Sequence, residues 1–101
     1  MVKVFISQPM KGKTEDEILR ARDKAIEEAV KLFNGPVQII DSFLERRDTE
    51  VKHVPLSYLA ESLALLADAD AAYFIEGWKD ARGCRIERRC CEEYGILAID
   101  Q

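Results

Sequence analysis

Hydrophobic positions along this chain form short apolar runs separated by longer segments with a helical period. Val2–Ile6, apart from Lys3, and Ala71–Ile75 are apolar runs. Both are too short for a helix and too uniformly apolar for a strand with one face in solvent, so they predict buried strands. Val37–Ile40 and Ile96–Ile99 are similar short runs and predict two more strands.

Three segments between these runs carry apolar residues at three- and four-residue spacing, which is typical of helices. The first begins with a capping box at Thr14–Glu17 and ends at Asn34–Pro36, where a left-handed cap and a proline follow one another. The second starts at Pro55, which suits the first turn of a helix. The third is expected over Arg82–Tyr94, with Gly95 as its cap.

This alternation of strands and helices predicts a parallel sheet with right-handed crossovers and helices on both faces. The expected fold class is α/β, a flavodoxin-like (Rossmann-like) three-layer α/β/α arrangement with a small parallel sheet of about four strands. A chain of 101 residues can form one core but not two, so a single domain over residues 1–101 is expected. The segment 42–54 is polar and aperiodic and predicts a surface loop.

Composition narrows the function classes. Fifteen basic and nineteen acidic side chains give a net charge of -4, and no lysine or arginine stripe is present, so a nucleic-acid polymer is not an expected partner. A secretory signal and a membrane-spanning run are also missing, which predicts a cytoplasmic protein with no membrane association. The small size favours association, so a homodimer or a higher homo-oligomer is expected.

Three cysteines, Cys84, Cys90 and Cys91, all fall within the third predicted helix. Their odd number and close clustering argue against a disulfide framework and favour reduced thiols. They lack a fourth partner for zinc, because His53 is the only histidine and lies far away in the sequence. We therefore expect no metal and no cofactor.

Glu87 lies on the apolar side of the third predicted helix. At about 100° per residue, that side also carries Gly83, Ile86, Cys90, Cys91 and Tyr94. A buried carboxylate is costly unless it is paired or hydrogen-bonded, so Glu87 needs a structural partner or a function. An inward-reaching arginine or a neighbouring loop would be a structural partner, and this alternative stays open. Gly83, four residues earlier, leaves room for a ligand to approach Glu87.

The segments Ala69–Phe74 and Gly83–Glu87 resemble the nucleoside 2′-deoxyribosyltransferases and the related 2′-deoxynucleoside 5′-phosphate N-hydrolases. The stretch Val4–Gly12 is similar to the first strand and ligand loop of that superfamily. The whole chain resembles more closely an uncharacterised, often phage-associated branch of it, in which the stretches FISQPMKGK and ARGCRIE recur.

The resemblance implies cleavage or exchange of the N-glycosidic bond of a (deoxy)nucleoside or nucleoside 5′-monophosphate, with a covalent glycosyl-Glu87 intermediate. Glu87 would be the catalytic nucleophile. Two positions that hold aspartate in the superfamily are Ser62 and Ala81 here. They motivate the alternative, a non-catalytic module that binds a nucleotide or an ADP-ribose-like ligand.

Residues expected to bind the substrate follow the strands or lie near the start of the third helix, at the rim where ligands of such sheets bind. They are Phe5, Ser7, Gln8, Met10, Lys11, Gly12, Asp41, Ser62, Gly77, Trp78, Arg82 and Gly83. Trp78 could stack on a base or simply cover the helix edge. Arg82 is a better candidate than Arg85 for a phosphate, because Arg85 falls on the polar side of the helix. Tyr94 is expected to pack, and Asp70 to cap a turn.

Overall fold

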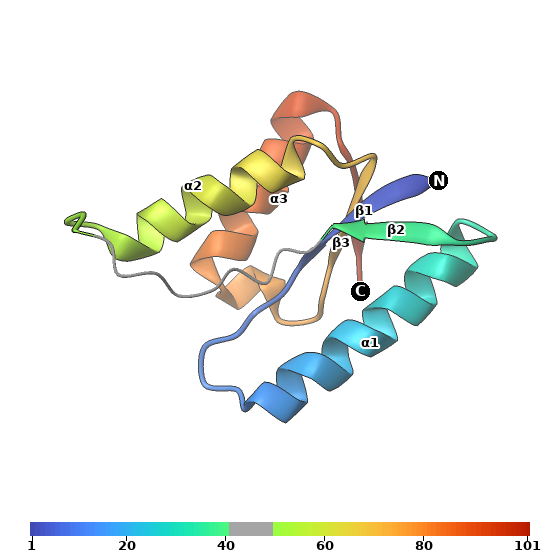
Figure 1. The fold of residues 1–101 in the computed structure, drawn as a ribbon, viewed down its shortest axis with the longest axis horizontal. Coiled ribbons are helices and arrows are strands. Elements are labelled where there is room, and N and C mark those ends of the chain that lie inside the picture. Colours follow the sequence, from blue (N-terminus) through green and yellow to red (C-terminus); the bar gives the residue numbers. More distant parts are fainter. Residues whose placement is uncertain (41–49) are drawn as a thin grey trace.

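The computed structural model describes residues 1–40 and 50–101 as four strands, three α-helices and one 3-10 turn (Figure 1). In chain order these are β1 (Val2–Ser7), α1 (Glu15–Leu32), β2 (Val37–Ile40), α2 (Val54–Leu66), β3 (Ala71–Phe74), η1 (Trp78–Asp80), α3 (Arg82–Tyr94) and β4 (Leu97–Asp100). The strands are all parallel and lie in the order β2-β1-β3-β4. The predicted flavodoxin-like α/β/α class is confirmed.

Local sequence signals account for the ends of the helices. Thr14 and Glu17 form the predicted capping box at the start of α1, with each side chain bonded to the other residue's backbone N–H. Gly95 ends α3 in the left-handed conformation at φ 70°. The Ile96 N–H donates to the Cys91 carbonyl at 3.0 Å and closes the helix, so β4 begins at Leu97, one residue later than predicted.

Three other boundaries differ from the prediction by small amounts. α2 begins at Val54, inside the segment expected to be a loop, with Pro55 in its first turn. β3 ends at Phe74, although the Ile75 N–H still donates to the Ser7 carbonyl at 3.0 Å. The turn η1 occupies part of the expected loop before α3. These are differences in element ends, where chain geometry is set by individual hydrogen bonds.

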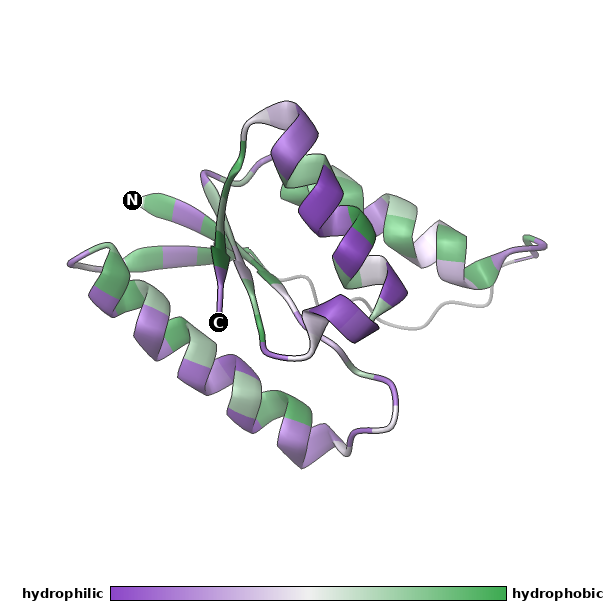
Figure 2. Ribbon diagram, turned by 180° about the vertical axis from the view of Figure 1, so that it is seen from behind, coloured by the Kyte–Doolittle hydropathy of each residue, from purple (hydrophilic) through white to green (hydrophobic). Residues whose placement is uncertain are grey.

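The core has two halves because successive side chains of the central strands point to opposite faces of the sheet. Figures 1 and 2 show α1 on one face and α2 and α3 on the other. On the α1 side, Val4, Ile6 and Tyr73 pack with Ala25 and Ala29. On the other side, a second cluster contains Phe5, Ala72, Phe74, Leu66 and Cys91. The two alanines of α1 let that helix approach the sheet closely.

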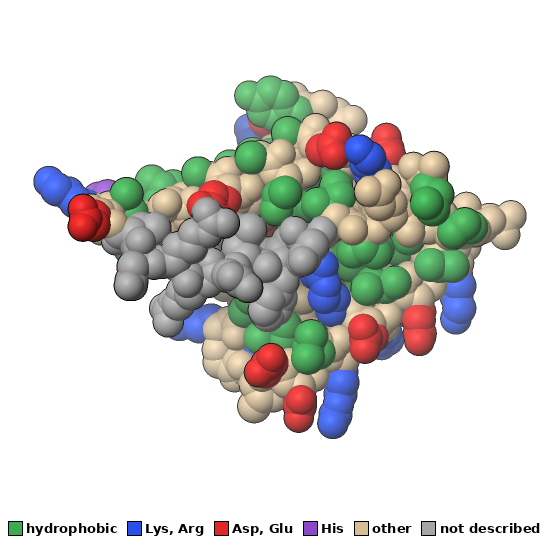
Figure 3. All heavy atoms as spheres, in the orientation of Figure 1, with side chains coloured by type: hydrophobic (Ala, Val, Ile, Leu, Met, Phe, Trp, Pro, Cys, Tyr) green, Lys and Arg blue, Asp and Glu red, His purple; other side chains and the backbone are tan. Residues whose placement is uncertain are grey.

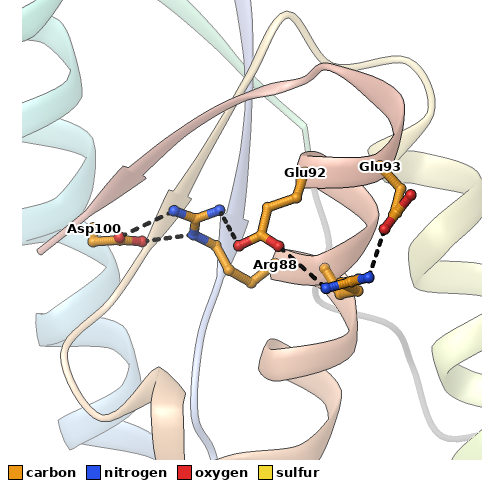
Figure 4. A network of polar contacts seen from close by, with 5 residues as sticks. Arg88, Glu92, Glu93 and Asp100 are labelled. Atoms are coloured by element: carbon orange, nitrogen blue, oxygen red, sulfur yellow. Dashed lines mark hydrogen bonds and ion pairs between the residues drawn. The ribbon is translucent and has the colours of Figure 1, made fainter.

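Arg88 fastens α3 to the edge strand β4 (Figure 4). Its guanidinium donates to both carboxylate oxygens of Asp100, at 3.0 and 3.3 Å, and to Glu92 one turn along α3. The same guanidinium lies 5.7 Å from the ring centroids of both Phe74 and Trp78. Trp78 therefore packs where η1, α3 and the sheet meet.

Asp70 has the turn role that its position predicts. Its carboxylate accepts from the Lys3 backbone N–H at 2.8 Å, and its own N–H donates to the Lys3 carbonyl at 2.9 Å. It thus joins the start of β3 to β1, at the end of the sheet opposite the carboxyl ends of the strands.

The predicted apolar face of α3 is partly wrong. The buried residues of α3 are Cys84, Glu87 and Cys91. Ile86 is 38% exposed and Tyr94 is 82% exposed, so the expectation that Tyr94 packs is not met. The helix is rotated toward the stripe of small cysteines, because these let α3 lie against the sheet, and Glu87 falls inside that stripe.

α2 is apolar over most of its surface, yet Leu66 is its only fully buried residue. Leu56 is 62% exposed, and hydrophobic side chains are visible over α2 along the upper edge of Figure 3. A helix that is apolar on all sides is usually covered by other protein. The homo-oligomer expected from the sequence stays a prediction.

Candidate active site

The two central strands, β1 and β3, connect to helices on opposite faces of the sheet, and the place between them is the switch point of the sheet. From β1 the chain passes to α1 on one face, and from β3 it passes through η1 to α3 on the other face. In open α/β sheets, ligands bind at such a point, beyond the carboxyl ends of the strands. A cavity of about 1150 Å³ lies there. Its wall consists of the segment after β1, one side of α2, the turn before α3 and the first turns of α3.

Glu87 projects from α3 into the wall of this cavity and is 6% exposed. The Ser7 hydroxyl, at the end of β1, donates to Oε1 at 2.6 Å. The Ser62 hydroxyl, on α2, donates to Oε2 at 2.7 Å. Both carboxylate oxygens are therefore held by hydroxyl donors from two other elements.

Burial raises the pKa of Glu87 above its usual value, and the hydrogen bonds from Ser62 and Ser7 oppose that shift. Each hydroxyl donates to the carboxylate form, which these bonds favour over the protonated form. The arginine or loop considered as a structural partner from the sequence is not the partner found. The site holds a desolvated carboxylate with a fixed orientation.

Ser7 and Ser62 differ in their access to the cavity. Ser62 lines it, whereas Ser7 is 1% exposed and lies behind Glu87. The bond to Oε2 therefore comes from a residue of the cavity wall, and the bond to Oε1 comes from a buried residue. Ser7 therefore supports the Glu87 carboxylate from inside the protein, and Ser62 forms part of the cavity wall.

Cys84 also lines the cavity, one turn before Glu87, and is buried. Burial raises the pKa of its thiol, the nearby Glu87 charge raises it further, and a hydrogen bond with Ser7 opposes these effects. Cys84 therefore stays a neutral thiol at neutral pH and is a poor nucleophile.

Eight residues predicted for the site line the cavity. They are Gln8, Met10, Lys11, Ser62, Gly77, Arg82, Gly83 and Glu87. Gly77 needs its lack of a side chain for backbone reasons, since its φ is 95°. Gly83 does not, because an added Cβ would meet its nearest atom, on Leu59, only at 4.0 Å. The open space at Gly83 faces the cavity that it lines.

Four predicted residues, all among those that the structure describes, do not line the cavity. Phe5 is 1% exposed and packs in the core cluster with Phe74 and Leu66. Side chains alternate between the two faces along β1, and this alternation places Phe5 in that cluster. Trp78 packs on Phe74 with ring centroids 5.6 Å apart and does not line the cavity, which favours its covering role over base stacking. Gly12 is exposed outside the lining, and Ser7 acts from behind Glu87. Asp41 lies outside the described residues.

Other lining residues were not predicted for the site. On α2, Pro55, Tyr58 and Leu59 join Ser62 in lining the cavity, at positions three, four and seven residues apart. This spacing places them on one side of the helix. The apolar residues of α2 do not distinguish this side of the helix from the side that faces the sheet. Only the polar Ser62, between Leu59 and Leu63, could have indicated which side lines the cavity. Lys13, Asp80, Cys84 and Arg85 complete the unpredicted set together with Pro9 and Ala81.

Residues 1–40 and 50–101 contain no group of three or more histidine, cysteine, aspartate or glutamate side chains arranged to hold a metal ion. Within the same residues, no helix has the length and apolar character needed to cross a membrane.

Comparisons with known proteins identify the family of this chain. No curated protein and no solved structure matches it. One family model matches residues 2–100, nearly the whole length, and includes every strand and helix described above. The chain therefore belongs to the family described as Domain of unknown function (DUF4406).

Proposed function

We propose that this protein cleaves or exchanges the N-glycosidic bond of a (deoxy)nucleoside or nucleoside 5′-monophosphate, with Glu87 as the nucleophile. The observation that carries the proposal is the Glu87 carboxylate, buried at the switch point of the sheet and facing a cavity of about 1150 Å³. The similarity of Ala69–Phe74 and Gly83–Glu87 to the nucleoside 2′-deoxyribosyltransferases supports the same assignment.

The geometry suits a nucleophile that must attack from one direction. Ser7 anchors Oε1 at 2.6 Å from a buried position, and this bond fixes the plane of the carboxylate. Oε2 is bonded to Ser62, a residue of the cavity wall, and is the oxygen that we assign to the attack. A preoriented carboxylate in a desolvated wall reacts without first reorganising water around it.

The reaction proceeds in two displacement steps at the anomeric carbon. In the first, Oε2 forms a bond to C1′ while the C1′–N bond breaks, and its electron pair leaves with the base. In the second, a water oxygen bonds to C1′ and the ester C1′–O bond breaks, which regenerates the carboxylate. The proton released by that water balances the proton taken up by the base. Attack by another base in place of water completes an exchange.

Release of free base from a panel of 2′-deoxynucleosides and their 5′-monophosphates tests the proposal. The wild-type protein is expected to release base, and Glu87→Gln is expected to lose at least about a thousandfold in rate, as removal of a covalent nucleophile does. Glu93→Gln is the matched control, because Glu93 is an exposed glutamate on the same helix. It is expected to retain the wild-type rate.

The proposal fails if no substrate of the panel releases base, or if Glu87→Gln releases it as fast as the wild type. Tight binding of an intact nucleotide without product would instead support the non-catalytic binding module.

A further inference from the structure

Two helices, α2 and α3, form the cavity wall at Glu87 and meet there at two successive turns. Both cover the same face of the sheet (Figures 1 and 2). At the first turn, Leu59 Cδ1 of α2 lies 4.0 Å from the position that a Cβ on Gly83 of α3 would occupy. At the second turn, the Ser62 hydroxyl donates to Glu87 Oε2 at 2.7 Å. All four residues line the cavity.

The first of these turns is open and apolar. Gly83 contributes no side chain there, and the Leu59 side chain offers only C–H groups. The space in front of Gly83 borders Glu87, which follows one turn later on the same helix. A sugar ring placed there has its C–H groups on Leu59 and its anomeric carbon toward Glu87, which is the arrangement that the proposed attack requires.

The Ser62 hydroxyl at the second turn has unused capacity to accept hydrogen bonds. A serine hydroxyl has one proton to donate and two lone pairs that accept. The Ser62 proton is directed to Glu87, and no group of residues 1–40 and 50–101 donates to Ser62 Oγ. Ser7 is 1% exposed, whereas Ser62 is half-buried in the cavity wall. A ligand in the cavity can therefore reach Ser62, while Ser7 serves the carboxylate alone.

Stereochemistry decides which group of the substrate comes near Ser62. In a β-nucleoside, the nucleophile approaches C1′ from the face of the sugar opposite to the base. The 2′-hydroxyl of ribose lies on that same face, on the carbon next to C1′. Reacting atoms lie about 3–3.5 Å apart before attack, so Ser62 Oγ, 2.7 Å from Oε2, lies within about 6 Å of C1′. Of the sugar hydroxyls, the 2′-hydroxyl is the one next to the attacked carbon on this side.

We infer that Ser62 accepts a hydrogen bond from the 2′-hydroxyl of the substrate, and that the substrate is therefore a ribonucleoside or a ribonucleotide. This inference rests on the proposed function, of which it specifies the sugar. The bonds form a chain, in which the 2′-hydroxyl donates to Ser62 and Ser62 donates to Glu87. Successive hydrogen bonds of this kind strengthen one another. Because Ser62 already donates to Oε2, the 2′-hydroxyl is directed to Ser62 and not to the nucleophile.

The expected discrimination against 2′-deoxy sugars is modest. A site rejects a substrate that lacks a hydroxyl most strongly when a buried protein group is left unpaired. Ser62 is half-buried, and its proton keeps its bond to Glu87 whichever sugar binds. One hydrogen bond to a neutral acceptor in such a position corresponds to about a tenfold difference in affinity. 2′-Deoxynucleosides therefore remain substrates and bind more weakly.

Binding of C-nucleosides tests the inference without cleavage, because their base is attached to C1′ through carbon. Pseudouridine and formycin, each with its 2′-deoxy form, supply one pyrimidine pair and one purine-like pair. Calorimetry of the full wild-type chain is expected to show that the ribose form of at least one pair binds about tenfold more tightly than the 2′-deoxy form. The 2′-deoxy-2′-fluoro form has no proton to donate at this position and is expected to bind like the 2′-deoxy form.

Ser62→Ala is expected to remove the difference between the ribose and 2′-deoxyribose forms, and Ser62→Thr, which keeps a hydroxyl, is expected to retain it. Loss of the Ser62 bond to Glu87 alone affects both sugars equally and leaves their ratio unchanged, so the ratio reports the contact with the sugar. Ser57→Ala is the matched control, because Ser57 is a partly buried serine of α2 that does not line the cavity. It is expected to keep the wild-type ratio.

Equal binding of the ribose and 2′-deoxyribose forms by the wild type, binding of none of the C-nucleosides, or an undiminished preference in Ser62→Ala would overturn the inference. Base release with a ribose to 2′-deoxyribose ratio of kcat/KM that Ser62→Ala leaves unchanged would contradict it while leaving the proposed function intact. A preference for ribose that depends on Ser62, with no base release from any nucleoside, would have the opposite meaning: the sugar site exists, and the proposed glycosidic chemistry is wrong.

Discussion

Glu87→Gln is expected to stabilise the fold at neutral pH although it removes the nucleophile. Glutamine has the shape of glutamate, so it keeps contacts with the hydroxyls of Ser7 and Ser62, while the buried charge disappears. Burying one carboxylate costs several kcal/mol, here taken as about 4 kcal/mol. In the variant the amide oxygen accepts from one serine hydroxyl and the amide NH2 donates to the other serine oxygen, and each of these neutral hydrogen bonds is weaker by about 1 kcal/mol than the bond to the carboxylate. The net gain is therefore about 2 kcal/mol, or about 8 °C in melting temperature for a domain of this size.

The gain is expected to depend on pH in a defined direction. Burial raises the pKa of Glu87 above the model-compound value of 4.5, so the folded protein holds this proton more tightly than the unfolded chain. The contribution of the wild-type glutamate to stability is fully present below pH 4.5 and is lost as pH rises through the higher pKa of the folded state. Glutamine has no such loss. The difference between variant and wild type should grow from pH 4.5 upward and become constant above the folded-state pKa.

Urea unfolding of both proteins from pH 4 to pH 8 measures this difference, with Glu93→Gln as the control for a surface glutamate. A Glu87→Gln variant that is less stable than the wild type at pH 7, by an amount independent of pH, would refute the reasoning. It would show that Glu87 is retained for structural pairing and not at a cost to the fold.

Other substitutions test the remaining assignments. Ser7→Ala removes the buried donor to Oε1 and should raise the pKa of Glu87, which moves the acidic limb of the kcat/KM profile to higher pH; an unshifted limb would contradict the supporting role. Gly95→Ala forces a side chain into the left-handed conformation at φ 70° and should cost about 1 kcal/mol in denaturant unfolding, whereas Gly35→Ala, at a glycine without positive φ, should cost less. Leu66→Ala empties a site that is 1% exposed and should cost about 2–5 kcal/mol; a loss below 1 kcal/mol would mean that α2 is loosely packed on the sheet.

Sequence pattern was sufficient for the order of elements because strands and helices of this fold have different periods. The run Val4–Ile6 cannot be exposed on either face, and the capping box at Thr14–Glu17 acts within four residues. These are local effects. The starts of β4 and α2 were less exact, since single backbone hydrogen bonds, such as that from the Ile96 N–H to the Cys91 carbonyl, decide them.

The candidate site was predictable only in part. Glu87 was identified because a carboxylate within an apolar helical stripe is unfavourable, and that argument needs no partner. Tyr94 and Ile86 were assigned to the same face by their apolar character, but the exact rotation of α3 depends on which side chains fit against the sheet. The small Cys84 and Cys91 fit there. The hydropathy of a residue does not report its shape complementarity to a surface formed by distant residues.

The sequence by itself determined the alternation of strands and helices, the parallel α/β class and the burial of one carboxylate on α3, since each depends on periodicity over a few turns. Only the tertiary structure decided what holds that carboxylate. Ser7 and Ser62 lie 80 and 25 residues from Glu87 in the chain and meet it because β1, α2 and α3 converge at the switch point of the sheet. Hydroxyl positions are set by that convergence of elements, and no local pattern encodes a contact between side chains so far apart.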